Sequence, residues 1–177
     1  LKYCESQGQQ LASIVNVRES TMARASRYVF PTLAGPEIGV ASTKAFTCQL
    51  SVLASLAISA GVQRGHIDRD REIQLTRDLA EAPRFANEVL KLENEISQIS
   101  HSLANKQHVL YLGRDTNFPL ALEGALKLKE LSYIHAEGYA AGELKHGPIA
   151  LVDEEMPIVV IAPHDSIYEK TVSNMQE

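Results

Sequence analysis

The chain has 177 residues, of which 45% are hydrophobic, and its formal net charge is −5 at pH 7. This composition suffices for a packed core, and the acidic balance argues against a nucleic-acid partner, because binding a polyanion usually requires a basic patch. No apolar segment reaches the roughly 18 residues of a membrane span, and the first ten residues lack a signal-peptide pattern, so we expect a cytoplasmic chain without a membrane partner.

The spacing of cysteines and histidines predicts neither a disulfide nor a metal site. Cys4 and Cys48 lie far apart and form no CxxC pattern, so both are expected to be free thiols in helices. The six histidines show no ligand pattern such as HExxH. We therefore expect no metal and no cofactor.

The first third of the chain predicts two short buried strands and a long helix. Residues 11–17 and 27–32 are short, apolar and rich in β-branched or aromatic side chains, which is typical of buried strands. Small and apolar residues then run through 42–60 and predict a helix. Ser42 or Thr43 can cap its first turn, and the free backbone N–H groups there favour an anion or a sugar hydroxyl. The same residues could also be a cap and nothing more.

The middle of the chain predicts a helical connector. Residues 61–71 are polar, and 72–104 then carry apolar residues at helical spacing with one interruption at Pro83. Two helices joined near Ala82 and Pro83 fit this pattern. Their charged residues indicate a solvated face rather than a site.

The last third again alternates strand, loop and helix. Residues 107–113 form a continuous apolar strand that ends at a glycine, and 157–162 form another, followed by a helix from about Ser166. Between them, Asn117 and Pro119 are start signals for a central helix. The order predicts an α/β protein with two doubly wound parallel-sheet units, divided as 1–66, 67–100 for the connecting helices, and 101–177.

The central helix carries three charges on one side. At about 100° per residue, Glu123, Lys127 and Glu130 share an arc roughly 60° wide on a helix that is otherwise largely apolar. Buried charges are costly unless they are paired or used. A structural salt-bridge ladder and an acid–base site both fit this pattern.

A histidine follows at a chain reversal. His146 precedes Gly147 and Pro148, where a helix cannot continue. A carboxylate on a buried helix and a nearby histidine can serve as general base and general acid, although a single histidine is more often structural. The residues alone leave both readings open.

Two long motifs carry a family resemblance. The stretch ALEGALKLKELSYIHAEGYAAGELKHGPIALVDEEMPIVVIAP and, earlier in the chain, EIGVASTKAFTCQL resemble the isomerase part of the glutamine:fructose-6-phosphate aminotransferase family, in the same order. The resemblance covers essentially the whole chain. It implies sugar isomerase (SIS) domains with a three-layer αβα architecture, each partly represented here.

The resemblance implies a reaction and site residues. The family condenses ammonia from glutamine with fructose 6-phosphate and isomerises the product to glucosamine 6-phosphate, the first step of amino-sugar synthesis. Glu130 matches the family's base, Lys127 its active-site lysine, and His146 the ring-opening histidine that the partner subunit of a homodimer supplies. Val40 and Ser42 match residues that lie against the sugar phosphate.

The family's other parts have no counterpart in the sequence. The phosphate-binding loop, the C-terminal tail and the glutaminase domain with its cysteine nucleophile are expected to lie outside it. We therefore expect a fragment that does not perform the full reaction alone. A non-catalytic sugar-phosphate-binding module, a related sugar-phosphate deglycase, and a purely structural or interaction domain remain as alternatives.

Overall fold

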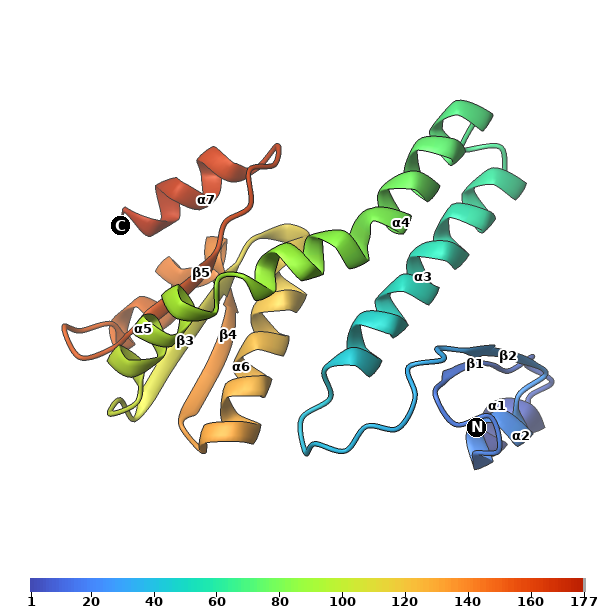
Figure 1. Cartoon of the computed structure of the whole chain (residues 1–177), viewed down its shortest axis with the longest axis horizontal. Coiled ribbons are helices and arrows are strands. Elements are labelled where there is room, and N and C mark those ends of the chain that lie inside the picture. The colour runs from blue at the N-terminus through green and yellow to red at the C-terminus, as the bar shows by residue number, and fades with distance from the viewer. Residues whose placement is uncertain (177) are drawn as a thin grey trace. The chain divides into compact units, whose positions relative to one another are not determined.

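The protein, a computed structural model that describes residues 1–176, forms two compact α/β units (Figure 1). Unit 1 is Leu1–Lys91, and unit 2 starts at Leu92. Each contains parallel strands together with helices, so the predicted α/β class is confirmed. The predicted helical connector is shared between the two units. Its boundaries at residues 66 and 100 stay a prediction.

Unit 1 is built around two parallel strands. Ala12 pairs with Tyr28 and Val15 with Pro31, which confirms both predicted strands of this half. The elements of unit 1 are α1 (Lys2–Ser6), β1 (Ala12–Val15), α2 (Thr21–Ala25), β2 (Tyr28–Pro31), α3 (Lys44–Gln63) and α4 (Arg69–Leu90).

The position of the break between the connecting helices was predicted wrongly. Helix α4 contains Pro83 in its interior and continues to Leu90. A proline lacks one N–H group and therefore removes one hydrogen bond of the helical ladder, and here the residues after Pro83 remain helical. The break falls instead after Lys91, and α5 begins at Glu93.

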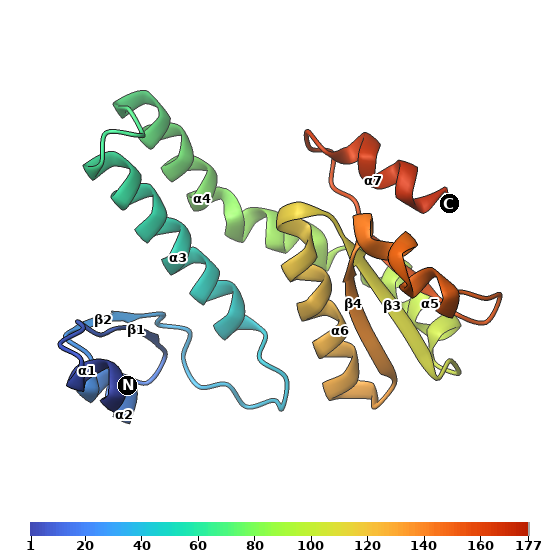
Figure 2. The ribbon, with the colours of Figure 1, turned by 180° about the vertical axis from the view of Figure 1, so that it is seen from behind.

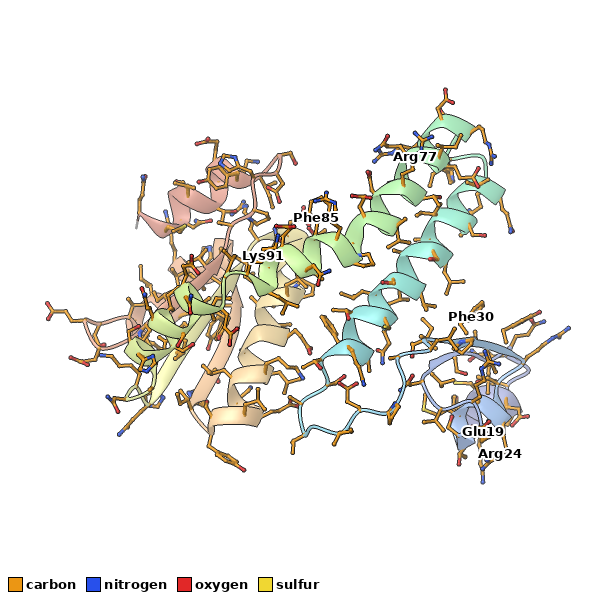
Figure 3. The ribbon with its side chains drawn as sticks, in the orientation of Figure 1. Glu19, Arg24, Phe30, Arg77, Phe85 and Lys91 are labelled. Carbon is orange, nitrogen blue, oxygen red and sulfur yellow. The ribbon has the colours of Figure 1, made fainter. Side chains whose placement is uncertain are left out.

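Helix α3 is longer and more apolar than expected. Over 20 residues it meets the length and composition of a membrane span, so the prediction that no segment does so is wrong. Only 6% of its most apolar window is buried. It lies beside α4 (Figures 1 and 2). It also lines an open groove of 360 Å³, and Phe30 of β2, which is labelled in Figure 3, belongs to the same lining. These neighbours make α3 a helix of the α/β unit.

Unit 2 contains a parallel three-stranded sheet in the order β4, β3, β5. The strands predicted at 107–113 and 157–162 are confirmed as β3 and β5, and the predicted central helix as α6. The elements of unit 2 are α5 (Glu93–Leu103), β3 (His108–Gly113), η1 (Asp115–Asn117), α6 (Phe118–Ser132), β4 (His135–Ala140), η2 (Ala141–His146), η3 (Pro148–Leu151), β5 (Ile158–Ile161) and α7 (Tyr168–Met175), where η marks a short 3₁₀ helix.

The two faces of this sheet are covered by different elements. On one face, Val109 packs with Ala125 of α6 and with Ala136 of β4. On the other face, Leu112 packs with Ala141 and Leu144, both from η2. Side chains alternate between the two faces along a strand, so Val109 and Leu112, three positions apart, point to opposite faces. Each therefore belongs to a different cluster. Figure 2 shows α6 running alongside β4 and β3.

Strand β4 was not among the elements predicted from the sequence patterns. Its sequence, HAEGYA, has no apolar run, and Ala136 is its only fully buried residue. The pattern of a buried strand is therefore absent. Gly138 is required for packing, since a Cβ atom there would lie 2.8 Å from the backbone nitrogen of Leu122. Helix α6 therefore packs closely on β4 through a residue that otherwise argues against a strand.

Candidate functional site

The charged stripe predicted on the central helix is present on α6. Ala121 and Ala125 are buried against the sheet, and the helical period places the charged residues on the side of α6 that faces away from it. Lys127 Nζ lies 2.7 Å from Glu130 Oε2 and 3.3 Å from Glu123 Oε1. All three side chains keep less than a third of their surface exposed, at 23 to 29%. The stripe is therefore a half-buried group of two carboxylates sharing one ammonium.

This arrangement keeps the lysine charged and one carboxylate oxygen available. The hydrogen bond that Lys127 donates to Glu130 raises the pKa of the lysine, and its bond to Glu123 adds to this. Within residues 1–176, Glu130 Oε2 accepts that bond and Oε1 accepts none. A carboxylate held through one oxygen can accept a proton from a bound molecule on the other. Ion pairing by Lys127 and a role of Glu130 as a base are thus compatible in one structure.

His146 lies elsewhere in unit 2. It is exposed at the end of η2, before Gly147, whose φ of 150° supports the predicted chain reversal. Through Leu144, η2 packs on the sheet face opposite α6. The structure therefore does not bring His146 together with Glu130 across unit 2.

Val40 and Ser42 belong to unit 1, in the segment between β2 and α3. Val40 is 87% exposed, and Ser42 is half-buried. The capping role expected of Ser42 or Thr43 is wrong, because the N-cap Thr43 makes no side-chain capping bond to α3. Of the N–H groups at the start of α3, those of Thr43 and Ala45 are not free for an anion, because both donate to Glu37.

The cap comes from Glu37, which the sequence patterns did not single out. Its Oε1 accepts hydrogen bonds from Thr43 N at 2.8 Å and Thr43 Oγ1 at 3.1 Å, and its Oε2 accepts one from Ala45 N at 3.2 Å. The backbone bond from Thr43 is the main cause that lowers the pKa of Glu37. An acidic residue six positions before the N-cap residue of a helix is a weak sequence signal, because ordinary capping patterns lie within one turn.

Three polar residues, His135, Glu137 and Tyr139, form a line along β4. His135 Nε2 lies 3.4 Å from Glu137 Oε1, and Tyr139 donates its hydroxyl to Glu137, which is the main cause that lowers the pKa of Glu137. His108 meets His135 with 3.1 Å between their Nδ1 atoms. These residues alternate with Ala136 and therefore face away from α6. In the described part of the chain, no three His, Cys, Asp or Glu side chains could hold a metal ion together.

Among protein families, the SIS domain matches the chain over residues 1–59 and 102–175. The chain is 72% identical over its whole length to the glutamine:fructose-6-phosphate aminotransferase (isomerizing) of Mesorhizobium japonicum and 71% identical to that of Brucella abortus. It spans 29% of the length of each of these relatives. The resemblance predicted from the two motifs is therefore confirmed.

Among solved structures, the chain is similar to the C-terminal domain of glucosamine-fructose-6-phosphate aminotransferase from Francisella tularensis. The TM-score is 0.95 and the sequence identity 46%, over 99% of this chain and 50% of that one. The structural similarity and the sequence similarity thus indicate the same family.

Proposed function

The chain belongs to the SIS domain family, and from this membership we propose that it supplies part of the isomerase machinery of a glutamine:fructose-6-phosphate aminotransferase. The single observation that carries the proposal is the Lys127–Glu130 pair on the half-buried side of α6, with Glu130 Oε1 left available. The similarity to aminotransferases at 71 to 72% identity supports the choice of reaction. The substrates would be fructose 6-phosphate and glucosamine 6-phosphate.

In this proposal Glu130 moves a proton between C1 and C2 of the sugar phosphate. Such a shift needs one base within reach of both carbons, and a carboxylate fixed on a helix provides this with little reorganisation. The ammonium of Lys127 would stabilise negative charge that develops on the substrate oxygen during the shift. Val40 and Ser42 would also contact a sugar phosphate.

We further propose that the active form is a homodimer in which His146 of one subunit completes the site of the other. The arrangement of unit 2 supports this, because the sheet lies between α6, which carries Glu130, and η2, which carries His146. In the ring-opening step His146 would exchange a proton with the ring oxygen of the sugar. The two free cysteines, Cys4 and Cys48, are consistent with the cytoplasmic location that we propose for the protein.

The proposal predicts that a sugar phosphate stabilises the full-length protein that carries this chain. A ligand that binds only the folded state raises the free energy of unfolding by RT ln(1 + [L]/Kd), or about 2.7 kcal/mol at 100 times Kd. Thermal unfolding with glucosamine 6-phosphate, compared with inorganic phosphate at equal concentration, measures this. We expect a rise in Tm that phosphate does not reproduce. Equal shifts with both, or no shift, would contradict sugar-phosphate binding.

A further inference from the structure

The segment that carries Val40 and Ser42 has no regular structure of its own. It runs from residue 32 to residue 43, between β2 and α3, without a helix or strand. Ile38 and Val40 are 95% and 87% exposed, and only Ala41 is buried in the middle of the segment, at 6%. A segment with so few packed side chains is mobile unless hydrogen bonds hold its ends.

One end of the segment is held by Asn16, the residue after β1. Its Oδ1 accepts hydrogen bonds from Thr32 Oγ1 and Ala34 N, both at 3.0 Å, and its Nδ2 donates to Gly35 O at 2.5 Å. These bonds fix the chain where it leaves β2. The exposed residues that follow are therefore tied at their N-terminal side.

The other end is held by Glu37. Its three hydrogen bonds to Thr43 and Ala45 close residues 37–45 into a loop against the first turn of α3. A carboxylate in this position is also favoured by the helix dipole. Because both oxygens of Glu37 are engaged, α3 begins at a fixed distance from the exposed residues of the loop.

We propose that Glu37 is a positioning residue for the substrate site. Its hydrogen bonds hold Val40 and Ser42 in the geometry that a sugar phosphate requires. This inference rests on the proposed function of those two residues. Glu37 itself does not contact the substrate in this scheme. Its carboxylate takes the place of the ligand anion that would otherwise be expected at the start of α3. Its hydrogen bonds to Thr43 and Ala45 attach the loop to the helix.

Two substitutions test the proposal in the full-length protein. Glu37→Ala removes all three bonds, whereas Glu37→Gln keeps an oxygen for Thr43 and cannot accept the N–H of Ala45. Since displacing a binding group by about 1 Å can cost up to roughly 100-fold, we expect Glu37→Ala to raise KM for fructose 6-phosphate about 10-fold, with a smaller change in kcat. Glu37→Gln should give an intermediate KM, and it remains a test if the alanine variant does not fold.

Asp68 provides a matched control. Its Oδ1 accepts the N–H of Arg71 at 2.8 Å and caps α4 in the same unit, far along the chain from the loop. Asp68→Ala should therefore leave KM for fructose 6-phosphate unchanged. An equal rise in KM for Asp68→Ala would overturn the proposal, because it would reduce Glu37 to a general helix cap.

Hydrogen exchange separates this inference from the proposed function. We expect the amides of Thr43 and Ala45 to exchange faster in Glu37→Ala than in the wild-type protein, whatever the substrate is. Faster exchange with an unchanged KM would overturn the positioning role while leaving the proposed function intact. A wild-type protein that fails to bind any sugar phosphate would instead overturn the proposed function, and the positioning role with it.

Discussion

Replacing Glu130 with Gln is expected to lower the turnover of the full-length protein by about 10²- to 10⁴-fold, the contribution typical of a general base. Glutamine has the same shape and keeps an oxygen for Lys127, but it cannot take up the proton. Binding of the sugar phosphate should persist, because the change affects the transition state and not the ground state. Steady-state kinetics together with a binding titration of Glu130→Gln measure both quantities.

Glu123→Gln is the matched control for this experiment. Glu123 belongs to the same helix and contacts the same lysine, at 3.3 Å instead of 2.7 Å. If the stripe on α6 were only a salt-bridge ladder, the two substitutions would have similar and small effects on turnover. A loss with Glu130→Gln that does not exceed the loss with Glu123→Gln would rule out the base.

Gly113→Ala is expected to destabilise unit 2 more than other single substitutions of its glycines. A Cβ atom on Gly113 would lie 2.1 Å from the carbonyl oxygen of Asn117 and 2.8 Å from the backbone nitrogen of Phe118. Both atoms belong to the backbone at the start of α6, which cannot rotate away as a side chain can. We expect a loss of roughly 3 kcal/mol or more in the free energy of unfolding, the upper end for overpacking.

Urea unfolding followed through hydrogen exchange of the β3 and α6 amides measures this loss. Gly142→Ala is the control in the same unit, because its Cβ atom would meet only the end of the Arg114 side chain, at 3.1 Å. We expect it to change the free energy of unfolding by less than about 1 kcal/mol. Similar effects at both glycines would mean that the β3–α6 connection can relax, and that Gly113 is not needed to place α6.

Most of the fold could be predicted from local patterns. The strands β1, β2, β3 and β5 are short runs of apolar residues, and α6 begins after its N-cap Asn117 with Pro119 in its first turn. Strand β4 could not be found in this way, because its glycine and polar residues reflect how closely α6 approaches it. The continuation of α4 through Pro83 was also beyond local patterns, since one missing hydrogen bond in a helix of 22 residues does not end it.

The candidate site was predictable where helical spacing alone determines it. Glu123 and Glu130 both contact Lys127 because of their positions on a single helix. The placement of His146 on the opposite sheet face depends on β4, which was missed, and on tertiary packing. Glu37 could not be identified because its bonds to Thr43 and Ala45 depend on the path of an irregular loop.

The most direct test of the account is complementation between two inactive variants, Glu130→Gln and His146→Ala. In a mixed dimer, one site combines both substitutions and the other is intact, so random reassembly should restore about one quarter of wild-type activity. Reassembly of Glu130→Gln with the double variant Glu130→Gln/His146→Ala should restore none. Activity no higher than that of the separate parents would contradict a site shared between Glu130 of one subunit and His146 of the other.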